Sequence, residues 1–349
     1  MRLMFVYYAF RNQGSGLVIK GYADAATRLG HEVVVYGRPH PGIPLNWSLD
    51  VASADAVVFI FEWTTHLRTG DELDLLRLVA EVPRRRRVVF DGDGNYNGPL
   101  RAGADYNHPD EEASRRWTEI CDALSDKICQ PTLHPLRPNV RPFLFYAYNP
   151  AWERPLHFSA KEYGMVYVGH SKFRWAPMQR VLQAIEPIRD RVGRIGLVGE
   201  GWGRPPWWAA PMGIEHTYYS DSAYLEKLGV DLLPPVPFDE VIDSMTRALL
   251  NPVLLRPTFE RMRLVNPRMF ETPAAGTIPL LNLDPAHIEE LYGQDGLELA
   301  LGHDASERIA DALDRPEYYG EVVTGVRDRL ARRHSHTARL QELVEIVES

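Results

Sequence analysis

The chain has 349 residues, of which 45% are hydrophobic and 25% are charged, and its formal net charge is −8. The length exceeds what one hydrophobic core usually serves and predicts two domains, while the composition is that of an ordinary globular protein. The acidic balance argues against a nucleic-acid partner. No apolar run reaches the ~20 residues that span a bilayer, so we expect a cytoplasmic protein.

The cysteines and the basic run suggest no metal, redox or polyanion site. Cys121 and Cys129 have neither the spacing of a zinc knuckle nor that of a redox pair, and we expect buried, reduced thiols. The run Arg84–Arg87 precedes a predicted strand, and we expect a solvated loop there rather than a polyanion site.

The first residues predict a βαβ unit. Its parts are a strand at Arg2–Tyr7, a glycine loop at Arg11–Gly16, a helix at Leu17–Leu29 that Gly30 ends, and a strand at His31–Tyr36. The glycines lack the spacing of a dinucleotide-binding loop, and no acidic residue closes the second strand, so that function is not favoured. Gly14 and Gly16 would let the backbone approach a ligand closely, and a plain tight turn is the alternative.

Two buried strands are followed by polar residues. Ala56–Phe61 is continuously apolar, which is typical of a parallel strand covered on both faces, and Val88–Phe90 is the next buried strand. Ligands of open α/β sheets bind outside the carboxyl ends of the strands. The candidates placed there are Glu62, Trp63 and His66 after the first of these strands, and Asp91 and Asp93 after the second. The Asp-x-Asp pair leaves a metal site, a structural loop and an acceptor-side role open.

The rest of the chain continues the alternation of strands and helices. The first half ends with a helix at Asp110–Leu124, a strand at Lys127–Gln130 and a proline-rich stretch that places a domain boundary near residue 155. Beyond it we expect strands at Met165–Val168, Ile195–Val198 and Pro252–Leu255, and helices at Pro177–Arg191, Phe238–Leu250, Pro285–Leu291, Ala305–Leu313 and Pro316–Val347.

A turn rich in hydrogen-bond donors follows the first strand of the second half. It contains Gly169, Lys172 and Arg174, and the two cations are suited to neutralise a diphosphate. Solvent-exposed turn cations are the alternative.

The stretch Leu264–Asn282 predicts a loop, a capped helix and a buried strand. Asn266 suits the N-cap, Pro267 the first helical position and Gly276 a left-handed C-cap, after which Ile278–Leu281 forms the strand. The helix N-terminus and Arg268 offer donors to an anion, and the carboxylate of Glu271 is able to accept from a pair of hydroxyls. A nucleotide diphosphate carries this combination of groups.

The pattern Asn-x-Arg-x-Phe-Glu-x-x-Ala-x-Gly at 266–276 resembles the donor-site signature of GT-B glycosyltransferases, in the version of the CgeB-like branch of the family-1/family-4 superfamily. The segments Gly164–Arg174 and Gly196–Gly203 resemble further elements of that family's second domain. The resemblance implies that Glu271 binds the ribose hydroxyls of a nucleotide sugar. Arg263 departs from the pattern, because retaining members commonly carry a second glutamate there.

From this resemblance we expect an α/β protein with two Rossmann-like domains facing across a cleft. Residues 1–155 would form the acceptor domain, 156–325 the nucleotide-sugar donor domain, and 326–349 a helix that packs back towards the first. The implied activity is metal-independent transfer of a hexosyl or deoxyhexosyl group from a nucleotide-diphosphate sugar, preferably a UDP-sugar, to a small-molecule or glycan hydroxyl. No resident cofactor is implied, and the oligomeric state stays open.

The expected site has two parts. Donor-binding residues are Glu271, Arg268, Asn266, Arg174, Lys172, Gly169, Gly14 and Gly16, and candidates for the catalytic base are Glu62, then Asp93, then His66. Desolvation beside Trp63 would make Glu62 a stronger base, whereas Asp93, between two glycines, is expected to be solvated. A sugar-nucleotide epimerase of similar fold and a catalytically idle binding module are the alternatives, and DNA glucosylation is disfavoured by the charge.

Overall fold

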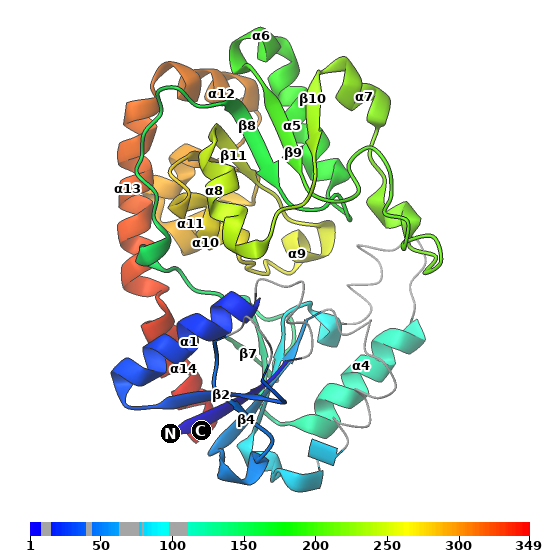
Figure 1. The fold of residues 1–349 in the computed structure, drawn as a ribbon, viewed down its shortest axis with the longest axis vertical. Helices are drawn as coiled ribbons and strands as arrows, with labels where there is room; N and C mark the ends of the chain where they lie inside the picture. The colour runs from blue at the N-terminus through cyan, green and yellow to red at the C-terminus, as the bar shows by residue number, and fades with distance from the viewer. Residues whose placement is uncertain (8–14, 40–43, 63–76, 79, 98–110) are drawn as a thin grey trace. The chain divides into compact units, whose positions relative to one another are not determined.

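The computed structural model describes residues 1–7, 15–39, 44–62, 77–78, 80–97 and 111–349. Contacts divide the chain into two compact units. The first comprises Met1–Ala147, Arg261–Pro267 and His334–Ser349, and the second comprises Tyr148–Glu260 and Arg268–Arg333. Each unit is built on one parallel sheet flanked by helices, which confirms the predicted α/β class with two Rossmann-like units (Figure 1). Within these residues, no helix is both long and apolar enough to cross a membrane.

The first unit contains a seven-stranded sheet whose strands are all parallel. In sheet order they are β3 (Trp47–Ser48), β2 (Glu32–Tyr36), β1 (Arg2–Val6), β4 (Ala56–Phe61), β5 (Arg87–Asp91), β6 (Ile128–Gln130) and β7 (Val140–Pro142). The chain moves outward from β1 to one edge and then from β4 to the other. Open α/β sheets bind ligands beyond the carboxyl ends of the two strands at which the order reverses, here β1 and β4.

Helices cover both faces of this sheet. In Figure 1, α1 (Ser15–Leu29) and α14 (His336–Glu348) lie on one side and α4 (Glu111–Leu124) on the other. Phe5 of β1 packs edge-on against Tyr22 of α1, with ring centroids 5.6 Å apart, whereas its neighbour Met4 lies in the core cluster that includes Cys121 of α4. Because successive strand residues point to opposite faces, the continuous apolar runs of the sequence are buried on both sides.

The second unit contains a five-stranded parallel sheet. Its order is β10 (Val230–Leu233), β9 (Ile195–Val198), β8 (Tyr163–Val168), β11 (Ala248–Val253) and β12 (Ile278–Leu281), so the order reverses at β8 and β11. The helices of this part of the chain are α5 (Trp175–Ile185), α6 (Arg189–Val192), α7 (Ser222–Lys227), α8 (Val241–Thr246), α9 (Pro257–Arg261), α10 (Arg268–Ala274), α11 (Pro285–Tyr292), α12 (Ala305–Asp314) and α13 (Pro316–Arg333).

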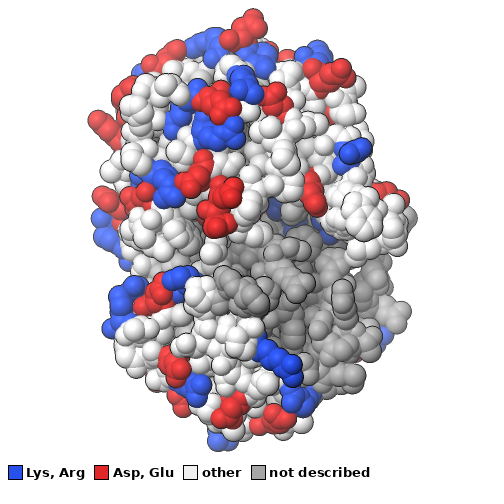
Figure 2. Space-filling model, in the orientation of Figure 1, with Lys and Arg blue, Asp and Glu red and all other residues white. Residues whose placement is uncertain are grey.

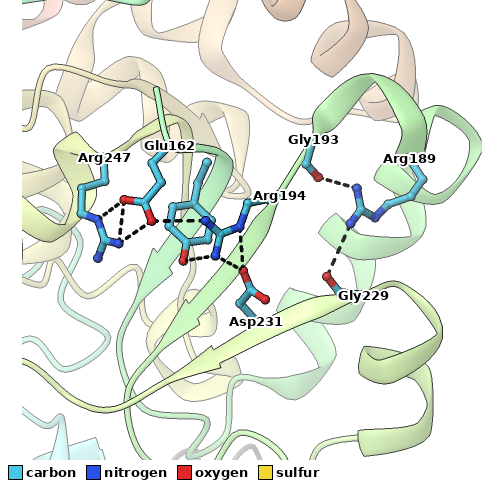
Figure 3. Close-up of polar contacts among 8 residues, drawn as sticks. Glu162, Arg189, Gly193, Arg194, Gly229, Asp231 and Arg247 are labelled. Carbon is cyan, nitrogen blue, oxygen red and sulfur yellow. Dashed lines mark hydrogen bonds and ion pairs between the residues drawn. The ribbon is translucent and has the colours of Figure 1, made fainter. Parts of the chain in front are cut away.

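Charged side chains join the amino ends of the second sheet (Figure 3). The guanidinium carbons of Arg194 and Arg247 lie 4.4 Å and 5.3 Å from the ring centroid of Tyr163. Glu162 accepts hydrogen bonds from both arginines, and Arg194 also pairs with Asp231 of β10 at 2.9 Å. These contacts link the amino ends of neighbouring strands. The carboxyl ends of the strands lie on the opposite side of the sheet.

Three expected helices differ from the structure. The helix expected at Pro177–Arg191 is α5 and α6, separated by a 3₁₀ turn at Glu186–Ile188. The helix expected at Phe238–Leu250 ends at Thr246, and β11 begins at Ala248, because this apolar run pairs with both β8 and β12. The single helix expected at Pro316–Val347 is two helices, α13 and α14. Ser335 separates them, and its hydroxyl caps α14 by accepting from the backbone N–H of Ala338 at 3.3 Å.

Candidate active site

The turn after β8, residues 169–174, is fixed by the segment that follows β9. Phe173 N–H donates to the carbonyl of Thr217 at 2.7 Å, and the indole N–H of Trp202 donates to the carbonyl of Gly169 at 2.8 Å. Gly199 has φ +145°, and a Cβ there would stand 2.4 Å from the carbonyl oxygen of Gly169. The position therefore requires glycine, and the turn is held in one conformation.

His170 lies in this turn, and four cationic side chains affect its pKa. Burial, followed by the charges of Arg174, Lys172, Arg256 and Arg268, holds the pKa of His170 well below its usual value. Arg174 Nη1 lies 3.0 Å from His170 Nδ1, a contact that a neutral imidazole accepts. The imidazole is thus uncharged, and the positive charge of the site belongs to the surrounding lysine and arginines.

Arg256, the third of these cations, follows β11, the second of the two strands at which the strand order reverses. Strand β11 is adjacent to β8, and the guanidinium carbon of Arg256 lies 3.9 Å from the ring centroid of Phe259. Lys172 is only 8% exposed. Cations that converge on the carboxyl ends of the two strands at which the order reverses form a site suited to a polyanionic ligand. The sequence-based interpretation missed Arg256. Like Glu62, it comes just after an apolar strand, and the same reasoning could have identified it.

Helix α10 brings the two central residues of the 264–282 stretch to the same strand end. Arg268 Nε donates to the carbonyl oxygen of Val168, the last residue of β8, at 2.8 Å, and the Arg268 guanidinium forms an ion pair with Oε2 of Glu271. Glu271 is 7% exposed. Among the described residues none donates to its other oxygen, so one face of the carboxylate is left to accept hydrogen bonds.

The boundaries predicted for this stretch are confirmed in part. The helix starts at Arg268, Gly276 follows it with φ +67°, and the strand spans Ile278–Leu281. A Cβ at Gly276 would stand 2.5 Å from the carbonyl oxygen of Pro155, so glycine is required. The capping contact expected from Asn266 is wrong, because its Oδ1 is buried and accepts no hydrogen bond from the described residues.

In the first unit, Glu62 follows β4 and is half-buried. Its Oε2 accepts a hydrogen bond from Tyr7 at 2.9 Å, and its Oε1 accepts one from Tyr146 at 3.1 Å. Because Tyr7 directly follows β1, the carboxylate lies where the strand order of this sheet reverses. Tyr146 belongs to the proline-rich stretch from which only a domain boundary was predicted.

The two aspartates at the carboxyl end of β5 have different environments: Asp91 is its last residue and Asp93 follows it. Asp91 is fully buried and accepts hydrogen bonds from Asn95 N–H, Tyr96 N–H and the Gln130 amide, each at 2.9 Å. Burial raises the pKa of Asp91, and the three hydrogen bonds oppose that rise. Asp91 thus holds the loop, which favours the structural interpretation for this residue. Asp93 is 9% exposed, so the expectation that it is solvated is wrong.

The remaining predicted residues lie elsewhere or outside the description. His66, Trp63 and Gly14 fall outside the described residues. Gly16 is the second residue of α1 and not part of a loop, because the helix begins at Ser15. Both cysteines are buried free thiols, as expected, and burial raises the pKa of Cys121 and of Cys129.

Elsewhere in the described residues we find no comparable candidate site. A recess of about 580 Å³ at the amino ends of β9 and β10 is lined by Arg189, Arg194, Lys227 and acidic neighbours. Each of these cations already bonds a carboxylate or a carbonyl. Figure 3 shows Arg189 and Arg194 with their partners. Within the described part of the chain, no three His, Cys, Asp or Glu side chains form a group that would hold a metal ion.

Comparison with known proteins bears on both units. Residues 179–345 match the sequence model of the family described as "Glycosyl transferase-like". No curated protein sequence matches the chain. This family match runs from within α5 to within α14 and therefore includes Arg256, Arg268 and Glu271.

Several solved glucosyltransferases have a similar fold. An alpha-glucosyltransferase in complex with UDP and a 13-mer DNA has 13% sequence identity and a TM-score of 0.65, over 100% of this chain and 99% of that chain. The DNA-modifying beta-glucosyltransferase, solved with and without uridine diphosphoglucose, has 11% identity and a TM-score of 0.60, over 100% of both chains. A T4 phage BGT in complex with UDP and Mn²⁺ has 11% identity and a TM-score of 0.59, over 100% of both chains.

At these identities the structural likeness establishes the fold, while the narrower CgeB-like assignment stays a prediction. The parallel sheets, the position of the candidate site residues at strand-order reversals and the family match are all consistent with that fold. The chain has the fold of the GT-B glycosyltransferases, and its residues 179–345 resemble the glycosyl transferase-like family.

Proposed function

We propose that the chain is a glycosyltransferase that moves a hexosyl or deoxyhexosyl group from a UDP-sugar to an acceptor hydroxyl without a metal ion. The observation that carries the proposal is the convergence of Lys172, Arg174, Arg256 and Arg268 on the carboxyl ends of β8 and β11. A nucleotide diphosphate matches this charge. The UDP that is present in the similar structures supports the choice of nucleotide.

The donor would be held mainly by the second unit. Lys172, Arg174 and Arg256 would neutralise the diphosphate and stabilise its charge as it leaves, the role that a bound cation plays in metal-dependent transfer. The carboxylate of Glu271, oriented by its ion pair with Arg268, would accept from the ribose hydroxyls. Gly169, Asn266, Gly14 and Gly16 remain proposed contacts of the donor.

The acceptor would be held by the first unit, with Glu62 as the base. Arg263 occupies the position of the retaining family members' second glutamate, so we propose inversion, in which the acceptor oxygen attacks the anomeric carbon directly. A positioned base contributes about 10²- to 10⁴-fold to such a step. Asp93 and His66 follow Glu62 as candidates.

For the acceptor we propose a small-molecule or glycan hydroxyl rather than DNA. The similar structures include enzymes described as DNA-modifying or bound to DNA. In this chain, however, the basic run is engaged within the fold: Arg84 pairs with Asp126 at 2.7 Å, Arg86 bonds the carbonyl of Asp55, and Arg87 is buried. Over the described part of the face in Figure 2, Lys, Arg, Asp and Glu side chains are interspersed, whereas phosphate backbones are held by clustered cations.

Proton NMR of the products tests the proposal. The chain is incubated with UDP-glucose or other UDP-hexoses, with and without a panel of hydroxyl acceptors that includes DNA carrying a hydroxymethylated base. We expect UDP and a new anomeric signal only when a non-DNA acceptor is present. The coupling constant of that signal reports inversion or retention.

Other results would support other functions. Epimerisation of the UDP-sugar without acceptor would identify an epimerase. UDP binding without any product, over the whole panel, would identify an idle binding module. A glycosylated DNA product would overturn the proposed acceptor class and leave the transferase function in place.

A further inference from the structure

Two tyrosines from distant parts of the first unit share one carboxylate. Tyr7 follows β1 and Tyr146 follows β7, yet their hydroxyls donate to Oε2 and Oε1 of Glu62 at 2.9 Å and 3.1 Å. The tyrosines are 4% and 3% exposed, while Glu62 is half-buried. The two phenol groups therefore lie on the protein side of a carboxylate that still reaches the surface.

The second tyrosine is rigidly held. The ring of Tyr146 packs edge-on against Phe90 and Phe145, with centroid distances of 6.2 Å and 5.6 Å. A Cβ at Gly92 would stand 3.4 Å from the Tyr146 hydroxyl, so the residue after β5 lies against that oxygen. A hydroxyl confined in this way fixes the direction of the carboxylate to which it donates.

The two phenol hydroxyls favour the ionised form of the carboxylate. Each phenol donates to a different oxygen of Glu62, and an ionised carboxylate only accepts hydrogen bonds. Hydrogen bonds to the ionised form favour that form, so both tyrosines stabilise the state in which Glu62 is able to accept a proton.

We propose that Tyr7 and Tyr146 are positioning residues that orient Glu62 and keep it ionised for general-base catalysis. This inference rests on the proposed function. In the step it serves, the acceptor O–H bond breaks and its proton passes to Glu62. The acceptor oxygen forms a bond to the anomeric carbon, and the bond from that carbon to the diphosphate oxygen breaks, with its electron pair leaving on UDP.

The test compares pH profiles of Tyr7→Phe and Tyr146→Phe with wild type, using UDP-glucose and the acceptor identified by NMR. Each variant loses one hydrogen bond to the carboxylate. We expect the acid limb of kcat to move to higher pH by about one unit and kcat to fall about 3- to 10-fold, with the KM for UDP-glucose unchanged.

Tyr148→Phe is the matched control. Its hydroxyl is also buried and donates to a glutamate, Glu153, at 2.9 Å, but in the second unit. We expect its pH profile to coincide with that of wild type. In a Glu62→Gln background, Tyr7→Phe should change the residual kcat less than about twofold, because the carboxylate that Tyr7 orients is absent. If Tyr7 had a purely structural role, its substitution would lower kcat by the same factor in both backgrounds.

The outcomes separate the two proposals. If wild type turns over but both tyrosine variants keep its acid limb, or if Tyr7→Phe costs as much in the Glu62→Gln background, the positioning role is overturned and the transferase function stands. If wild type forms no product with any acceptor, the transferase function is overturned and the positioning role with it.

Discussion

The Nε atom of Arg268 donates a hydrogen bond to the carbonyl oxygen of Val168 across 2.8 Å. This contact joins the first residue of α10 to the last residue of β8, and the same guanidinium pairs with Glu271. Only a planar fork makes both contacts from one side chain. The relationship explains how a short helix and a strand end form one binding surface.

Arg268→Lys should therefore be a costly substitution despite its retained charge. A single ammonium cannot reproduce both contacts, and we expect UDP to bind about 10-fold more weakly by calorimetry, and about 100-fold more weakly to Arg268→Ala. Arg180→Lys is the control, since Arg180 is half-exposed and forms a long surface ion pair with Glu260 at 3.7 Å. Wild-type affinity in Arg268→Lys would show that the fork plays no part in binding.

Metal independence is the second prediction. The proposed site places several cations where a diphosphate would leave, so turnover should persist in excess EDTA. The assay is product formation from UDP-glucose with EDTA, with added Mg²⁺ and with added Mn²⁺. Activity that EDTA abolishes and a divalent ion restores would contradict this prediction and direct attention to Asp93, because Asp91 is already bonded to its own loop.

Acid should destabilise the first unit through His336. Burial lowers the pKa of His336 to about 4; the charge of Arg28 adds to this effect and Asp24 opposes it. The unfolded chain takes up a proton below about pH 6.5, whereas the folded chain does so only near pH 4, so stability is lost as the pH falls through that window.

We expect this histidine to account for about 2 kcal/mol of the change in unfolding free energy between pH 7 and pH 5. Urea unfolding of His336→Gln at the two pH values should lack that part of the change, whereas the exposed control His303→Gln should keep it. An unchanged pH dependence in His336→Gln would contradict the assignment. The close approach of Gly21, whose Cβ would stand 2.2 Å from the imidazole, explains why the ring has no room to move to solvent.

Asp91→Asn should separate stability from catalysis. Both carboxylate oxygens accept backbone N–H groups, and an amide nitrogen in either place would face a donor. We expect a loss of about 2 kcal/mol in the free energy of unfolding, measured by urea titration at pH 7. The control is Asp126→Asn, because Asp126 is exposed and its surface pair with Arg84 should have little effect on stability. An unaltered stability in Asp91→Asn would return Asp91 to the list of catalytic candidates.

The sequence was most informative where local signals agreed. The strand Ala56–Phe61, the strand Ile278–Leu281 and the left-handed Gly276 were all predicted correctly, because a continuous apolar run or a glycine after a short helix has few alternatives. The helix expected to reach Leu250 failed because pairing with two neighbouring strands overrides helical spacing, and such pairing is not a local property.

The site was predictable in its types of residue but not in its partners. Glu62, Arg268 and Glu271 were found from strand ends and from the family resemblance. Tyr7 and Arg256 were not, although each follows a strand at a switch point. Which strands are adjacent depends on the order β1–β4 and β8–β11, which the sequence does not state, so the residues that meet across those pairs appear only in the fold.

The most direct test of the account is whether Glu271 recognises the ribose of a uridine diphosphate. UDP and 2′,3′-dideoxy-UDP are titrated by calorimetry into wild type and into Glu271→Ala and Glu271→Gln, with thermal unfolding as the check on the fold. We predict that wild type prefers UDP by about 2 to 3 kcal/mol, that Glu271→Gln keeps part of the preference, and that Glu271→Ala binds both ligands equally. A folded Glu271→Ala that retains the full preference for UDP would contradict the assignment of the donor site.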